Sequence, residues 1–191
     1  MKRIFAVFIT LALVLALLPV SALADVPTVP TGKDITYDTS TFKCFFANGI
    51  PITIQATEPA YPAVSTTPVG FNASGNDAYI VWEDSNGTKY CGVNKSVLVF
   101  GGADGSAGPE SVASTDVKMT GGTIWRLYAG NYGEPNTLSG QITKTPSAVT
   151  GNAKIDVTGG VVTDYIAAGW LNSAVNGTVT IDVSNMTAPS C

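Results

Sequence analysis

Hydrophobic and polar residues alternate in three related segments of the chain. In residues 116–120 the apolar side chains of Val117 and Met119 alternate with polar ones, and residues 154–158 and 181–184 repeat this pattern. Alternation with a period of two is typical of a strand that buries one face. The pattern therefore predicts three similar strands, each with one face against a core.

The spacing between the copies predicts a repeat architecture. Val117 aligns with Ile155, and Ile155 aligns in turn with Ile181. The first interval is longer than the second because the first copy carries an insertion within residues 133–150, where Gly, Pro, Ser and Thr predict a loop. Both intervals fall in the range of about 20–50 residues that indicates solenoids, propellers or arrays.

Glycine pairs at residues 121–122 and 159–160 follow the first two copies, and a second short strand is predicted after each pair, near 124–129 and 162–167. Glycine reaches positive φ without a Cβ clash, so the pairs predict corners. No helical period is present, and we therefore expect an all-β fold with a short parallel β-helix, or solenoid, over residues 95–188. The alternative is a β-sandwich in which the glycine pairs are hairpin turns.

The segment before the repeats predicts an N-terminal cap. Residues 41–54 contain Asn48-Gly49, a strong hairpin signal, and residues 78–100 repeat this form with turns at Asn86-Gly87 and near Asn94. We therefore assign capping hairpins to residues 41–94, because a solenoid needs its edges covered.

Three further segments complete this organisation. Residues 55–76 are predicted to form an irregular loop inside the cap, and residues 25–40 a flexible N-terminal segment. Residues 97–105 resemble residues 126–133 and indicate an earlier partial copy of the repeat.

The first residues predict export from the cell. Lys2 and Arg3 precede an apolar run over residues 4–20, and Ala22-Leu23-Ala24 follows. This order is typical of a cleavable signal peptide over residues 1–24, with a retained membrane anchor as the alternative. We expect a secreted protein that is free or associated with the cell surface, without membrane insertion after cleavage.

Charge and composition exclude several functions. Beyond residue 24 the chain has eight basic and fourteen acidic residues, a net charge of −6, and Arg126 is its only arginine. Nucleic acid is therefore an unsuitable partner, because that affinity needs many phosphate contacts. The absence of histidine excludes Ser-His-Asp and Cys-His catalysis. We expect no catalytic residue, no metal and no cofactor.

The three cysteines leave their pairing open. Cys44 and Cys91 are the candidate disulfide, and such a bridge suits an oxidising compartment. The odd count leaves one thiol over, most simply Cys191, which either links two chains in a dimer or stays free.

Several short motifs carry a resemblance to a known group. They are ANGIPITI at residues 47–54, YIVWEDSNGTKYCGV at 79–93, VFGGADG at 99–105 and the VTGG turn at 157–160. Together they resemble secreted right-handed β-helix repeat proteins of Gram-positive gut bacteria, over most of residues 41–187. The resemblance implies a β-coil with an adhesin-like role and supplies no catalytic residues.

Aromatic residues of the repeats are the candidate ligand site. The set comprises Trp125, Tyr128, Tyr132 and Trp170, with Asn131 and Asn172 as hydrogen-bonding neighbours. Flat aromatic rings can stack on sugar rings, whereas the alternative is that they fill the interior or the corners.

We expect a non-catalytic surface or matrix interaction protein whose ligand is a glycan or a partner protein. One alternative is a β-helix enzyme that cleaves polysaccharides with Asp156 and Asp182, and another is a structural component of a surface layer or fibre. Arg126 aligns with Asp164 in the next copy, which predicts an ion pair between successive coils.

Overall fold

The structure is a computed structural model of the 191-residue chain. It describes residues 36–38, 43–59, 64–65, 75–84, 87–106, 110–133 and 147–187. The predicted signal peptide (1–24), most of the predicted insertion (134–146) and Cys191 lie outside the described residues. The described ranges contain strands, turns and irregular segments without a helix, and this confirms the all-β prediction.

In chain order the strands are β1 (Thr36–Asp38), β2 (Cys44–Phe46), β3 (Ile52–Gln55), β4 (Val64–Ser65), β5 (Ala78–Asp84), β6 (Gly87–Val93), β7 (Leu98–Phe100), β8 (Asp104–Gly105), β9 (Ser111–Val112), β10 (Thr115–Ile124), β11 (Arg126–Tyr128), β12 (Tyr132–Gly133), β13 (Ser147–Val149), β14 (Ala153–Val162), β15 (Ile166–Ala167), β16 (Ser173–Val175) and β17 (Val179–Val183). They form a seven-stranded sheet (β17-β14-β10-β3-β5-β6-β4), a five-stranded sheet (β1-β2-β7-β11-β15), a three-stranded sheet (β16-β13-β9) and a two-stranded sheet (β12-β8).

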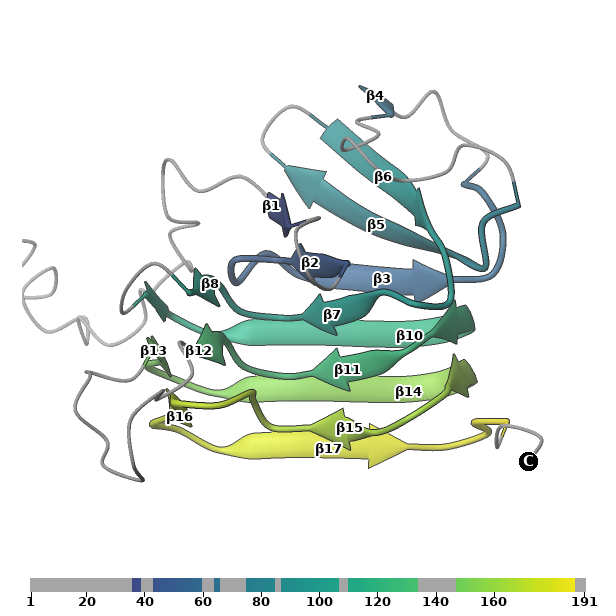
Figure 1. The fold of residues 1–191 in the computed structure, drawn as a ribbon. Coiled ribbons are helices and arrows are strands. Elements are labelled where there is room, and N and C mark those ends of the chain that lie inside the picture. The colour runs from purple at the N-terminus through teal and green to yellow at the C-terminus, as the bar shows by residue number, and fades with distance from the viewer. Residues whose placement is uncertain are drawn as a thin grey trace, which may run out of the picture.

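The chain visits these sheets repeatedly in one order. Strands β7, β8, β9 and β10 belong to the five-, two-, three- and seven-stranded sheets, and β11, β12, β13 and β14 follow the same order. Strands β15, β16 and β17 then return to three of the four sheets. Each strand pairs in parallel with its counterpart in the next passage, and Figure 1 shows β10, β14 and β17 side by side.

The register agrees with the alignment made from the sequence. Val117 is paired with Ile155, and Ile155 with Ile181. The earlier partial copy also aligns as predicted, because Phe100 is paired with Tyr128. A repeated sequence therefore places like residues on neighbouring strands.

The glycine pairs do not form the corners that we expected. Gly122 and Gly160 have φ values of 85° and 97°, as glycine permits, but both lie inside the continuous strands β10 and β14. They accompany a register irregularity between the two strands, and the change of sheet comes later, at Trp125. Each pair is thus a bulge within a long strand. The second short strand predicted after each pair is present as β11 and β15.

The Asn48-Gly49 turn is a corner between two sheets, which corrects the predicted hairpin. Both residues have positive φ, 53° and 82°, yet β2 and β3 do not pair with each other. The amides of Asn48 and Gly49 donate to the carbonyls of Gly102 and Gly101 in the next passage, at 3.0 and 2.9 Å. Bonds to the following corner replace the bonds that would close a hairpin.

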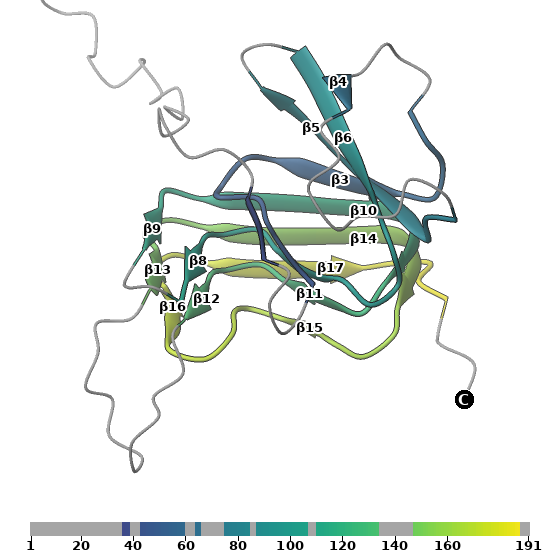
Figure 2. The same cartoon turned by 45° about the horizontal axis from the view of Figure 1, so that its top comes forward.

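Antiparallel strands close one end of the two larger sheets. The predicted second hairpin is present as β5 and β6, and β5 pairs with β3 (Figure 2). Strand β1 pairs antiparallel with β2. Part of the segment 25–40, which we expected to be flexible, therefore contributes a paired strand. Residues 85–86, much of the predicted loop 55–76 and the flanks of β1 lie outside the described residues.

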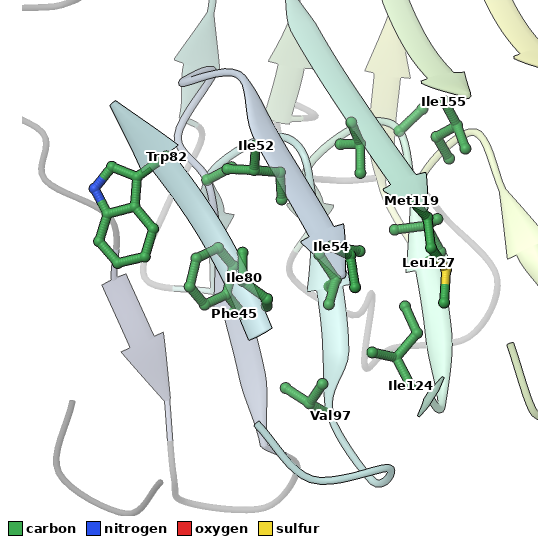
Figure 3. Packing of buried hydrophobic residues seen from close by; sticks show 14 of the residues in the cluster. Phe45, Ile52, Ile54, Ile80, Trp82, Val97, Met119, Ile124, Leu127 and Ile155 are labelled. Atoms are coloured by element: carbon green, nitrogen blue, oxygen red, sulfur yellow. The ribbon is translucent and has the colours of Figure 1, made fainter. Parts of the chain in front are cut away.

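The main core lies on the inner faces of the sheets. Figure 3 shows Ile52, Ile54, Met119, Leu127 and Ile155 converging from several strands. The column predicted from the repeat reaches β17, where its last member, Ile181, is 38% exposed. Strand β17 ends the sheet order, so no further strand covers that side chain.

Candidate functional site

A second cluster of aromatic residues lies on the opposite side of the five-stranded sheet from the main core. Side chains alternate along a strand, so Phe45, Val99 and Leu127 enter the main core while their neighbours point the other way. We call this second cluster, with Tyr165 at its edge, the aromatic face. Its members are Phe46, Phe100, Trp125, Tyr128, Tyr132, Tyr165 and Trp170.

Stacked rings form the buried floor of the aromatic face. Phe46, Phe100 and Tyr128 are register partners on β2, β7 and β11. The ring centroids of Phe46 and Phe100 are 5.2 Å apart, and those of Phe100 and Tyr128 are 4.4 Å apart with an interplanar angle of 4°. Parallel strands are about 4.8 Å apart, so the backbone spacing itself places one ring on the next. All three residues are buried.

The rim of the aromatic face is partly open to solvent. Tyr132 and Trp170 lie nearly parallel, with centroids 6.2 Å apart and an angle of 10°. Tyr165 and Trp170 each present an edge to Tyr128, at 5.8 and 5.5 Å. Such edge contacts are a favoured aromatic geometry. Tyr165 is 38% exposed, and Trp125, Tyr132 and Trp170 are half-buried.

Arg126 stands among the rim residues. Its guanidinium carbon is 4.3 Å from the ring centroid of Trp125, 4.6 Å from that of Tyr165 and 5.4 Å from that of Trp170. Its Nε donates to Asp164 Oδ2 at 2.7 Å, which confirms the predicted ion pair. Burial lowers the pKa of Arg126, but hydrogen bonds to Asp164 and Tyr128 outweigh this effect and raise it overall. A fixed positive charge thus lies among electron-rich ring faces.

Tyr128 belongs to the floor and stays uncharged. Burial raises the pKa of its phenol, and the hydrogen bond with Tyr165, whose hydroxyl oxygen lies 2.8 Å away, raises it further. A buried neutral phenol that is bonded to a neighbouring phenol orients the rim ring of Tyr165. Tyr128 therefore supports the surface that a ligand would contact.

Asn131 is structural, unlike the ligand-binding role that we predicted for it. The residue is fully buried, its Oδ1 accepts from the amide of Ala103 at 3.0 Å, and its Nδ2 donates to the carbonyl of Glu110 at 3.1 Å. Both hydrogen-bonding ends of the amide are thus used inside the protein. Asn172 is half-buried at a corner with a φ of 39°, and its carbonyl accepts from the amide of Ser147.

The structure therefore brings together Trp125, Tyr128, Tyr132 and Trp170 and gives Asn131 a structural role, whereas the ligand-binding role of Asn172 stays a prediction. Sequence reasoning left Tyr165 out of the candidate set. An alignment with one constant offset, set by Val117 and Ile155, matches Leu127 with Tyr165, whereas across the bulge Leu127 is paired with Ile166. A constant offset does not include this shift by one position. It therefore predicts Asp164 as the neighbour of Arg126 and misses Tyr165.

Replacing Asn131 with alanine is expected to lower the free energy of unfolding by about 1–3 kcal/mol, because the buried amide of Ala103 loses its acceptor and the partly buried carbonyl of Glu110 loses a donor. Asn152 provides the matched control, since its Oδ1 accepts from the amide of Thr178 at an exposed corner. Asn152→Ala is expected to cost less than about 1 kcal/mol. Urea unfolding followed by tryptophan fluorescence measures both, and equal losses would contradict the structural role of Asn131.

The structure does not join Cys44 and Cys91 in the candidate disulfide, and both residues are buried. Cys44 faces the aromatic side of β2, whereas Cys91 lies in the main core. Because β-strand neighbours alternate between faces, the predicted bridge would have to join two different clusters.

The thiols are expected to react only after unfolding. Burial raises the pKa of the Cys91 thiol, and the thiolate is the reactive form. In a Cys191→Ser variant, a colorimetric thiol reagent should find neither cysteine in the native protein and both in denaturant. The absence of thiols in denaturant would show that the bridge forms after all.

The carboxylates of the enzymatic alternative are neighbours on the outer face of the seven-stranded sheet. Asp156 is the register partner of both Lys118 and Asp182. The ladder Lys118–Asp156–Asp182 therefore exists as the repeat implies, on exposed or half-buried positions.

Within the described ranges, the chain has no helix that is long and apolar enough to span a bilayer. No protein-family model, curated protein or solved structure matches the chain.

Proposed function

We propose that this protein is a secreted, non-catalytic β-solenoid that binds a glycan through the aromatic face. The recurring order of sheets and the parallel register between passages support the solenoid. A β-sandwich of the immunoglobulin type, by contrast, is built from antiparallel strands. The short solenoid then acts as a rigid support that holds rings from successive coils at fixed separations.

The single observation that carries the binding proposal is the convergence of partly exposed rings around Arg126. Trp125, Tyr165 and Trp170 all lie within 5.4 Å of its guanidinium carbon. The buried stack beneath them fixes their orientation, so little conformational entropy is lost when a ligand binds. The C–H face of a sugar can rest on such rings, and a preformed, mostly apolar surface with few polar groups is the usual form of a ligand site.

The experiment is a glycan array, followed by titration of the best ligand into single-residue variants. Tyr165→Ala and Trp170→Ala are expected to weaken binding at least about tenfold, a loss of about 1.4 kcal/mol. Tyr79→Ala is the matched control, because Tyr79 is a half-buried tyrosine on β5 in an edge contact with Tyr90. Thermal unfolding of each variant checks that the fold is kept.

The outcomes separate the candidate functions. Glycan binding that depends on the rim supports the proposal, whereas binding that Tyr79→Ala reduces equally would overturn it. A partner protein captured through the same rim residues would replace the glycan as ligand. Release of reducing sugars from polysaccharides, lost in Asp156→Asn or Asp182→Asn, would establish the enzyme instead. A thiol-sensitive dimer in non-reducing electrophoresis, absent in Cys191→Ser, would favour the structural component.

A further inference from the structure

A hollow lies on the outer face of the seven-stranded sheet, away from the aromatic face. It is a cleft of about 360 Å³ where β10, β3, β5 and β6 meet. Its lining includes Pro51, Thr53, Val81, Glu83, Asp116 and Lys118. Its volume lies in the range of about 300–1,000 Å³ that is usual for small-molecule sites.

The strand register explains why the sheet is hollow at this place. Thr53 on β3 is paired with Lys118 on β10 and with Val81 on β5, so these three side chains form one row across the sheet. Ile52, which follows Pro51 in the chain, is paired with Val117 on β10 and with Trp82 on β5. The same register places Pro51 between Asp116 and Glu83, in the next row of the outer face. The middle residue of each row, Thr53 or Pro51, is compact. Lys118 stands at one end of the first row, and Asp116 and Glu83 stand at the two ends of the second.

The sheet geometry gives the cleft its width and depth. Strands β10 and β5 are separated by β3, and two strand spacings amount to about 10 Å. The hairpin β5–β6 also diverges from the direction of β3 and β10, as Figures 1 and 2 show. The middle of the cleft therefore lies over β3, with Asp116 on one side and Glu83 on the other.

The charged side chains of the cleft carry both signs. Within the described ranges, no hydrogen bond or ion pair occupies the side chains of Asp116, Lys118 or Glu83. An anionic ligand would meet two carboxylates, and a cationic ligand would meet the ammonium of Lys118. A neutral ligand with several hydroxyl groups can donate to both carboxylates and accept from Lys118, while Pro51 and Val81 contact its apolar face.

We propose that this cleft is a second binding site, specific for one neutral hexopyranose unit. The ring lies over Pro51, Thr53 and Val81, its hydroxyls donate to Asp116 and Glu83, and Lys118 donates to a ring substituent. This site is independent of the aromatic face, so either site can fail without the other.

The test is a titration of the isotope-labelled protein with the methyl glycosides of glucose, galactose and mannose, followed by amide chemical shifts. We expect at least one of them to bind with a Kd of about 1 mM, equivalent to about −4.1 kcal/mol. The amides of Thr53 and Lys118 should shift, whether or not those of Arg126 and Leu127, which report on the aromatic face, shift as well. Binding that moves only the latter pair, or no binding by any of the three, would overturn the proposal.

Variants provide the second measurement. Glu83→Gln, Asp116→Asn and Lys118→Met are each expected to weaken binding at least about fivefold, or roughly 1 kcal/mol. Lys154→Met is the matched control, because Lys154 is also exposed, on the next strand of the same outer face but outside the cleft. Trp170→Ala should leave this affinity unchanged. Full affinity in the three cleft variants, or tighter binding of a methylammonium or acetate ion than of any sugar, would refute the site.

Discussion

Replacing Ile155 with alanine is expected to lower the free energy of unfolding by about 2–5 kcal/mol. Ile155 is fully buried at the centre of three parallel strands, with Val117 on one side and Ile181 on the other. The loss combines the burial energy of the deleted carbons with the cavity that they leave, because neighbours in a stacked sheet relax only partly. Urea unfolding, followed by tryptophan fluorescence and far-ultraviolet circular dichroism, measures the change.

Ile181→Ala is the matched control for this experiment. The two isoleucines are register partners in the same sheet and carry identical side chains, but Ile181 is 38% exposed and has a neighbouring strand on one side only. Its replacement is expected to cost less than about 1 kcal/mol. If both substitutions cost the same, the stacked column is not what stabilises the protein.

Replacing Gly160 with alanine is expected to lower the free energy of unfolding by about 2–5 kcal/mol, from two separate causes. The first is backbone strain, because Gly160 has a φ of 97° and a Cβ in that region costs about 1–2 kcal/mol. The second is overpacking, because the added Cβ would lie 2.6 Å from the Met119 side chain and 2.8 Å from the Gly122 carbonyl oxygen. Overpacking typically adds about 1–3 kcal/mol.

A second glycine isolates the first cause. Gly75 has a φ of 72°, but a Cβ built there meets no atom within 4 Å. Gly75→Ala should therefore show the backbone strain alone, about 1–2 kcal/mol. Differential scanning calorimetry of the two variants and the parent protein gives the difference. A Gly160→Ala variant that is no less stable than Gly75→Ala would contradict the close approach between β10 and β14.

The repeat in the sequence predicts the register of the fold because register is what a repeat encodes. Once Val117, Ile155 and Ile181 occupy equivalent positions, parallel pairing places them side by side. The same alignment predicts the ion pair of Arg126 with Asp164, which forms even though the bulge shifts the register there by one position. Local turn signals are less informative. Asn-Gly favours positive φ wherever it occurs, and it does not specify whether the flanking strands pair with each other or with strands of the next passage.

The residue types of the candidate site could be predicted from the sequence, but the direction of its side chains and their exact register could not. Residue type alone marks Trp125, Tyr132 and Trp170 as aromatic, and the structure gathers them into one cluster although only Tyr132 belongs to a strand. The direction in which the Asn131 amide points depends on Ala103 and Glu110 of the preceding passage, so its burial could not be derived from its own segment. The position of Tyr165 depends on a register change that only the bulge produces.

The two ends of the stacked parallel strands differ, so further repeats can be added more readily at one end than at the other. At one end the edges of β2 and β3 are already occupied by β1 and β5, so an added repeat would have to displace paired strands. At the other end β15, β16 and β17 each have a partner on one side only. A duplicated unit joined after β17 could extend three sheets at once without breaking an existing hydrogen bond. Designed or evolutionary growth of this chain should therefore proceed from its carboxyl-terminal face.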